Sequence, residues 1–222
     1  MNLFRMAGDL SHVISILVLI LSIRVSQNAM GISMKTQELY LIVFLTRYLD
    51  LFTTFYSLYN SCMKVLYISS TAYILYMVRF TEPFKSTYEA SHDSFLHLQF
   101  AVAPCAVVAL VGGLWGGFED FSIMEVFWSF SLYLEALAIV PQLIVLQRYR
   151  EVENLTGHYV FFLGAYRLLY ICNWVYRSYH EENYHHNYVV YACGILQTVL
   201  YVDFFYYYIK SKYRGGKFAL PT

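Results

Sequence analysis

The stretch that decides the fold is Leu41–Tyr56, LIVFLTRYLDLFTTFY, in which a few polar side chains interrupt an apolar and aromatic run. Apolar residues flank Arg47 on both sides, so a helix through this stretch holds its guanidinium group near the middle of a bilayer. An ionised side chain there costs on the order of several kcal/mol unless it is paired or hydrated. In one continuous helix, spacings of three and seven residues place Asp50 and Thr54 on the face of Arg47. We therefore predict a membrane helix whose polar stripe faces a cavity and whose other sides face lipid.

The composition points to the same class of protein. Hydrophobic residues make up 59% of the 222 residues and charged residues only 14%, which leaves too little charged surface for a soluble domain of this size. Apolar stretches close to the length of a bilayer-spanning helix cover residues 7–23, 37–57, 64–80, 96–113, 122–146, 157–178 and 187–209. We predict an all-α integral membrane protein with seven transmembrane helices, a transmembrane domain over residues 1–209 and a cytosolic tail over 210–222.

The distribution of basic residues predicts the orientation of these spans. An odd number of spans places the two termini on opposite sides, and cytosolic loops carry the excess of lysine and arginine. The side of the C-terminus carries Arg24, Lys35, Arg79, Lys85, Arg148, Arg150, Lys210, Lys212, Arg214 and Lys217, whereas the other side carries Arg5, Lys64 and Arg177. We therefore expect a lumenal N-terminus and a cytosolic C-terminus, with Arg47 and Arg167 left inside the membrane.

A weak internal repeat relates the second predicted span to the sixth. At an offset of 120 residues the matching pairs are Thr36 with Thr156, Arg47 with Arg167, Leu49 with Leu169, Tyr56 with Tyr176 and Tyr59 with Tyr179. Two parallel three-helix repeats need one further helix between them to keep the same orientation, as in the sugar-transporter class of SWEET and PQ-loop proteins. We expect the fourth span to be that connector. Chance similarity is the alternative, because aromatic-rich helices align easily.

Polar side chains converge within the predicted bundle. Arg5, Asp9 and His12 follow spacings of four and three at the lumenal end of the first span. The fifth span carries Glu125, Trp128 and Glu135, and the seventh carries Gln197 and Asp203. The sixth span has a stripe of Tyr159, Tyr166, Tyr170, Asn173 and Arg177, with Arg167 and Trp174 beside it. Cations, acids and a titratable imidazole therefore meet inside one helical bundle.

Each of these groups also has a purely structural interpretation. Arg47, Asp50 and Glu135 could form an ion pair between helices, although intramembrane charges are functional by default, and for Arg167 and Asp203 we favour the structural role. Most tyrosines are expected to pack. His180, His185 and His186 lie in a polar loop without a matching acid and thiol set, so we predict a solvated loop there and no metal site or cofactor. The sequence shows no catalytic constellation, and we expect no enzyme activity.

Several motifs, in order, resemble one known family. They are Met1–Arg5 (MNLFR), Gly8–His12 (GDLSH), Gly31–Ser33 (GIS), Phe44–Phe52 (FLTRYLDLF), Ser57–Asn60 (SLYN), Tyr133–Ala136 (YLEA), Ile139–Leu143 (IVPQL), Phe161–Arg167 (FFLGAYR), Asn173–Trp174 and Gln197–Phe205 (QTVLYVDFF). These resemble the endoplasmic-reticulum retention-signal receptors, the KDEL receptor family, along nearly the whole chain.

The resemblance implies a receptor for soluble lumenal proteins that end in Lys-Asp-Glu-Leu or His-Asp-Glu-Leu. By similarity, Arg47 and Tyr48 bind the terminal carboxylate, since a guanidinium can bind a carboxylate bidentately. Arg5 and Arg177 would bind the acidic side chains of the ligand. The basic first residue would meet Asp50, Glu125 and Trp128. The full predicted ligand-binding set is Arg5, Arg47, Tyr48, Asp50, Thr54, Glu125, Trp128, Tyr166, Tyr170, Asn173, Trp174 and Arg177.

The resemblance also implies a trafficking cycle between the acidic Golgi and the neutral endoplasmic reticulum. His12 is the candidate pH switch, acting with Tyr166 and Glu135, because an imidazole changes charge across that pH interval. The basic tail residues Lys210, Lys212, Arg214 and Lys217 would recruit a vesicle coat, COPI first and COPII as the second candidate. The expected partners are the tetrapeptide, the vesicle coat and membrane lipid, and we expect no binding of nucleic acid. A small-solute transporter with the same three-helix repeats is the alternative function.

Overall fold

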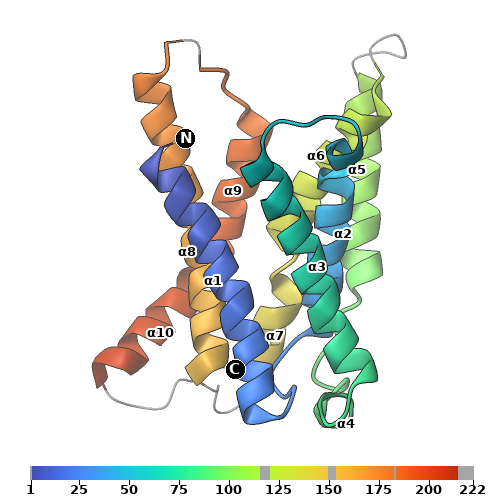
Figure 1. Cartoon of the computed structure of the whole chain (residues 1–222), viewed down its shortest axis with the longest axis vertical. Helices are drawn as coiled ribbons and strands as arrows, with labels where there is room; N and C mark the ends of the chain where they lie inside the picture. Colours follow the sequence, from blue (N-terminus) through green and yellow to red (C-terminus); the bar gives the residue numbers. More distant parts are fainter. Residues whose placement is uncertain (1, 116–120, 150–153, 183, 215–222) are drawn as a thin grey trace. The chain divides into compact units, whose positions relative to one another are not determined.

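The computed structural model describes residues 2–115, 121–149, 154–182 and 184–214, and this part of the chain consists of helices joined by short connections (Figure 1). The helices are α1 (Leu3–Ser26), α2 (Met34–Arg47), η1 (Leu49–Phe52), α3 (Leu58–Phe80), α4 (Phe84–Thr87), η2 (Leu98–Val102), α5 (Ala103–Trp115), α6 (Ile123–Leu137), α7 (Val140–Arg148), α8 (Asn154–His180), α9 (Tyr188–Leu200) and α10 (Val202–Arg214). The predicted all-α class is confirmed.

Five helical segments of the described chain are long and apolar enough to cross a membrane. They are Leu3–Ser26, Leu58–Phe80, Leu98–Trp115, Ile123–Arg148 and Tyr188–Tyr213. Each overlaps one of the predicted spans. The two other predicted spans correspond to α2 with η1, where α2 has only 14 residues, and to α8. Because α8 has 27 residues, its polar composition and not its length separates it from the five.

The continuous helix predicted across Leu41–Tyr56 is wrong, because α2 ends at Arg47. The backbone of Tyr48, with φ −102° and ψ 26°, leaves the α-helical region while its N–H still donates to the carbonyl of Phe44 at 3.0 Å. The chain then tightens into the 3₁₀ turn η1, and the N–H of Thr54 donates to the carbonyl of Asp50 at 2.8 Å. Helical spacing therefore does not relate Asp50 or Thr54 to Arg47. Arg47 lies at the C-terminus of α2, where the helix dipole favours a cation.

Two of the apolar stretches are also interrupted. Residues 122–146 divide into α6 and α7 just before Pro141, whose missing N–H cannot bond to the carbonyl of Leu137. Residues 187–209 divide into α9 and α10 at Tyr201, whose N–H bonds to carbonyls of the preceding turn. In Figure 1, α10 leaves α9 at a wide angle. Hydropathy alone does not register such breaks, because the residues at each break are as apolar as their neighbours.

The chain forms two compact units, Met1–Ile32 with Val145–Thr222, and Ser33–Ile144. The first unit holds α1, α8, α9 and α10; the second holds α2 to α6, with α7 starting in the second and ending in the first. The predicted repeats would group the first span with the second and third, so the units follow a different division of the chain. The duplication and its connecting fourth helix stay a prediction.

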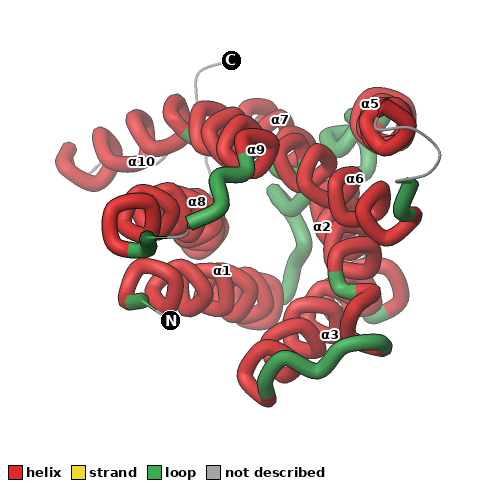
Figure 2. The backbone as a smooth tube through the Cα atoms, turned by 90° about the horizontal axis from the view of Figure 1, so that it is seen from above, coloured by secondary structure: helices red, strands yellow, loops and turns green. Residues whose placement is uncertain are grey.

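In the first unit, α1 and α8 lie side by side, with α9 on the other side of α8 (Figure 2). Leu19 and Ile23 of α1 are fully buried. Polar links accompany this apolar packing: Ser11 Oγ donates to the carbonyl of Phe162 at 3.0 Å, and Ser22 Oγ lies 3.4 Å from Thr156 Oγ1. Short hydroxyl side chains that bond across helices are typical of membrane helix pairs. This pairing fixes the position of α1 against α8.

In the second unit, α2 packs between α3 and α6, and a buried acid fixes its first turn. The carboxylate of Asp93, in the connection between α4 and η2, accepts hydrogen bonds from Ser33 Oγ at 2.8 Å, the Lys35 N–H at 3.1 Å and the Tyr88 hydroxyl at 2.7 Å. Burial, and then the bond to Asp93, raises the pKa of Tyr88 above its ordinary value. The Ser33 N–H also donates to Gln142 Oε1 at 2.9 Å. The start of α2, and hence Arg47 at its end, is therefore held by side chains from two other segments.

Candidate functional site

Arg47 is held by two side chains of α6. Its Nε donates to Ser131 Oγ at 3.0 Å, and its Nη1 lies 2.5 Å from Glu135 Oε2. The Glu135 side chain is only 5% exposed and that of Arg47 18%, so the two charges compensate each other where water is scarce. An ion pair between helices is the structural interpretation of Arg47 and Glu135 from the sequence, and the structure contains this ion pair. Ser131 was not predicted, although it lies four residues before Glu135 on the same helix face.

Tyr48, Asp50 and Lys64 form a second group beside Arg47. The Tyr48 ring stacks on Phe44 with 5.8 Å between ring centroids. Lys64 Nζ lies 2.7 Å from Asp50 Oδ2 and 5.7 Å from the centroid of the Tyr48 ring. The charge count placed Lys64 outside the membrane on the lumenal side. In the structure most of its side chain is buried, and its ammonium group forms an ion pair with Asp50. Asp50 therefore has a cationic partner within its own unit.

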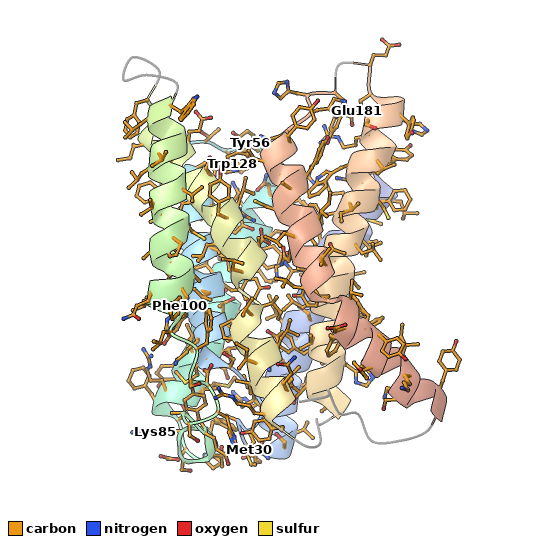
Figure 3. All side chains as sticks on the ribbon, turned by 180° about the vertical axis from the view of Figure 1, so that it is seen from behind. Met30, Tyr56, Lys85, Phe100, Trp128 and Glu181 are labelled. Atoms are coloured by element: carbon orange, nitrogen blue, oxygen red, sulfur yellow. The ribbon has the colours of Figure 1, made fainter. Side chains whose placement is uncertain are left out.

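The remaining predicted residues of the second unit lie nearer its surface. Thr54, Glu125 and Trp128 are all exposed, with Trp128 at 36%. Glu125 stands in the first turn of α6, where its N–H donates to Ser122 Oγ at 3.4 Å. The carbonyl of Trp128 accepts the hydroxyl of Ser131 at 2.6 Å, so the tryptophan stands one turn from the partner of Arg47. In Figure 3, Trp128 is labelled at the same end of the second unit as Tyr56.

His12 and Tyr166 form a stacked pair in the first unit. The two rings are nearly parallel, 9° apart in plane, with centroids 4.3 Å apart, and both residues are buried. The Tyr166 hydroxyl accepts hydrogen bonds from Arg167 Nη2 at 3.2 Å and Gln197 Nε2 at 3.3 Å. The imidazole of His12 thus connects α1, through one tyrosine, to α8 and α9. Two members of the predicted pH switch meet here, while the third, Glu135, belongs to the other unit.

Tyr170 and Asn173 attach α8 to the first turns of α1. The Tyr170 hydroxyl donates to Asp9 Oδ1, and Asn2 Nδ2 donates to Asn173 Oδ1 at 2.7 Å. Gly8 permits this approach, since a Cβ atom there would lie 2.9 Å from Tyr170 Cδ2. Arg5 lies one turn before Asp9 and is exposed. The predicted stripe of cation, acid and imidazole is therefore real, with the acid and imidazole engaged by α8 and the cation facing outward.

Arg177 lies near the end of α8 and binds Glu181 bidentately. Its Nε lies 2.8 Å from Oε1 and its Nη2 2.7 Å from Oε2. The hydrogen bond from Arg177 holds the pKa of Glu181 below its usual value. The guanidinium also lies 4.8 Å from the centroid of the Tyr184 ring. Figure 3 labels Glu181 at this end of the first unit. Because both side chains are well exposed, this ion pair contributes little to stability.

Trp174 packs against α9 rather than standing free. Gly194 makes room for it, as a Cβ atom there would lie 2.5 Å from Trp174 Cη2, and its ring centroid is 5.4 Å from that of Tyr191. At the other end of this unit the tail lysines lie over aromatic rings: Lys210 Nζ is 5.3 Å from the Tyr206 centroid and Lys212 Nζ 5.8 Å from that of Tyr208. Arg214 ends α10, and Lys217 lies outside the described residues.

Comparison with known proteins gives one consistent result. Residues 28–177 match the family model described as ER lumen protein retaining receptor. Over their full lengths, the chain is 51% identical to ER lumen protein-retaining receptor A of Arabidopsis thaliana and 49% identical to the ER lumen protein-retaining receptor of Petunia hybrida. It is 46% identical to ER lumen protein-retaining receptor 2 of Gallus gallus, again over the full length of both chains. The chain therefore belongs to the family of ER lumen protein retaining receptors.

Proposed function

We propose that this protein is a seven-span receptor that binds the C-terminal Lys-Asp-Glu-Leu or His-Asp-Glu-Leu signal of lumenal proteins in the acidic Golgi. It returns them to the endoplasmic reticulum and releases them at neutral pH. The observation that carries this proposal is the family membership over the full chain, together with an arginine, Arg47, that precedes Tyr48 at the end of α2 and is held by Glu135. Segments α2 with η1 and α8 are the two spans that join the five apolar ones. The N-terminus is lumenal and the C-terminus cytosolic.

The chemistry of the ligand suits these side chains. A free C-terminal tetrapeptide with two acidic side chains brings three carboxylates, and the proposed site has three arginines. Arg47 is held by Ser131 and Glu135, Arg177 by Glu181, and Arg5 is exposed. On Arg177, exchange of the Glu181 carboxylate for a ligand carboxylate keeps the cation compensated and releases Glu181 to solvent, because both side chains are exposed. Arg47 keeps Glu135 as its partner, so ligand binding there leaves no bare buried carboxylate.

Peptide binding to the purified protein tests this function directly. We expect a peptide that ends in Lys-Asp-Glu-Leu to bind at acidic pH and to bind more weakly at neutral pH, as measured by calorimetry or fluorescence anisotropy. The same peptide with an amidated C-terminus is the matched control, because it lacks only the terminal carboxylate. Equal affinity for both peptides, or no binding of either, would sink the proposal. Uptake of a small solute by proteoliposomes without peptide binding would instead support a transporter.

The tail supplies the cytosolic half of the proposed cycle. Replacement of Lys210, Lys212, Arg214 and Lys217 by alanine is expected to leave peptide affinity unchanged, because the first three lie in the second half of α10 and Lys217 follows it in the sequence, away from the proposed ligand-binding residues. Return of the receptor to the endoplasmic reticulum should be lost, because a vesicle coat could no longer bind the basic side chains of the tail. The measurement is the cellular distribution of tagged receptor with and without excess ligand. A quadruple variant that still redistributes on addition of ligand would contradict the proposed coat contact.

A further inference from the structure

Lys64 occupies an unusual position for a lysine in a membrane protein. It lies in the second turn of α3 with a side chain only 10% exposed. An ammonium group is strongly hydrated, so its burial is costly unless a partner compensates the charge. Here Asp50 Oδ2 lies 2.7 Å from Nζ, and the faces of Tyr48 and Tyr56 lie 5.7 Å and 5.4 Å from it, within cation–π range. Lys64 is therefore held by an acid and two aromatic rings.

The carboxylate of Asp50 is hydrogen-bonded and charge-compensated by Lys64. Within the described part of the chain, its Oδ1 is buried without a hydrogen-bond partner, and Lys64 supplies the hydrogen bond to Oδ2. The side chain is nevertheless 34% exposed, so an incoming group can still sense its charge. Asp50 also lies two residues after Tyr48 in the turn η1, close in sequence to Arg47. The pair therefore places a carboxylate whose charge Lys64 largely compensates three residues after Arg47.

We propose that Lys64 is a specificity-determining residue, which sets how strongly the receptor prefers a ligand with a basic first residue by neutralising Asp50. This inference rests on the proposed function and on the role of Asp50 in it. A ligand cation that approaches Asp50 meets a carboxylate already compensated by Lys64, and it is also repelled by the ammonium group itself. Both effects reduce the advantage of a basic over a neutral first residue. Lys64 thereby broadens the range of signals that the receptor accepts.

Removal of the ammonium group should sharpen the preference. The readout is the ratio of dissociation constants for peptides that end in Ala-Asp-Glu-Leu and Lys-Asp-Glu-Leu, measured at one acidic pH. We expect Lys64→Met to increase this ratio about tenfold, in favour of the lysine peptide. Lys64→Arg, which keeps the charge, should leave the ratio close to that of the wild type. If Lys64 had only a structural role, its replacement would lower the affinity for both peptides to a similar extent and would not raise the ratio of dissociation constants.

The double variant Asp50→Asn with Lys64→Met assigns the effect to this pair. With both charges absent, the ratio should return to the wild-type value or fall below it. Lys85→Met is the matched control, because Lys85 is exposed and lies at the opposite end of the second unit from Tyr56 (Figure 3). If Lys64→Met does not fold, Lys64→Gln removes the same charge while keeping a hydrogen-bond donor.

Two outcomes separate this inference from the proposed function. A wild-type receptor that binds neither peptide counts against the function itself. A wild-type receptor that binds both, with a ratio that stays within about twofold in the charge-removing variant, overturns only the role of Lys64. An increase that persists in the double variant also overturns it, because the effect would then not pass through Asp50.

Discussion

Replacement of Arg47 by lysine is expected to lower the affinity for the retention signal at least about 100-fold while leaving the receptor folded. Arg47 uses Nε for Ser131 and Nη1 for Glu135, so one planar group bridges two partners on α6. A lysine keeps the charge opposite Glu135, which preserves the fold. It cannot present the paired N–H groups that bind a terminal carboxylate bidentately, which removes the ligand contact. Calorimetric titration with the Lys-Asp-Glu-Leu peptide measures the loss.

The control for this variant is the same substitution at another ion pair of the second unit. Arg79 Nη2 lies 2.5 Å from Glu38 Oε1 and its side chain is 55% exposed, so Arg79→Lys makes the same chemical change outside the proposed site. We expect wild-type affinity for Arg79→Lys and an unchanged melting temperature for both variants. Peptide affinity retained by Arg47→Lys would refute its assignment to the terminal carboxylate.

Much of the site chemistry could be predicted from the sequence, because charged side chains in an apolar chain are rare and each needs a partner. Arg47 and Glu135 are conspicuous for this reason, and the structure pairs them. The stripe on the first span was predicted from spacings of three and four, and α1 is an unbroken helix there. Helical periodicity is reliable wherever the helix continues.

The same periodicity failed beyond Arg47, where the helix stops. Nothing in the local composition distinguishes Leu49–Phe52 from a continued helix, since aromatic and aliphatic residues fill both. The 3₁₀ turn places Asp50 against Lys64, a partner from the next helix. The contact between Asp50 and Lys64 is a tertiary contact, and neither residue spacing nor hydropathy predicts it. The buried contacts of Asp93, in a polar connection, were missed for the same reason: an acid between two helices looks solvated until its donors are known.

We expect the stacked His12 and Tyr166 rings to carry the pH dependence of the proposed receptor. An imidazole with an ordinary pKa of about 6.5 gains a proton between the neutral endoplasmic reticulum and the acidic Golgi. Protonated His12 would place its positive charge 4.3 Å from the centre of the Tyr166 ring, whose face attracts cations. It would also add positive charge to the proposed binding site for an acidic ligand. Protonation and ligand binding then favour each other, and linkage makes this coupling reciprocal.

His12→Ala is accordingly expected to weaken peptide binding at acidic pH by about tenfold and to flatten the pH dependence of affinity. A coupling of about 1.4 kcal/mol is sufficient for such a change. Since loss of a buried ring could disturb the packing of α1 on α8, His12→Phe serves as a second variant that keeps a ring on Tyr166 but cannot be protonated. It should flatten the pH profile in the same way. The measurement is peptide affinity at several pH values between acidic and neutral.

Three other histidines provide the comparison that makes this assignment specific; the structure places His180 at the end of α8 and not in the predicted loop, whereas His185 and His186 follow the helix. His180 stacks on Tyr176 at 4.1 Å and His186 Nδ1 lies 3.1 Å from the Tyr191 hydroxyl, but these histidines and His185 are exposed, where protonation changes little in the interior. Replacement of all three by alanine should therefore alter the pH profile less than either His12 variant. If the affinity of His12→Phe still falls steeply from acidic to neutral pH, the switch is not His12. If only the triple variant flattens the profile, the switch lies among His180, His185 and His186.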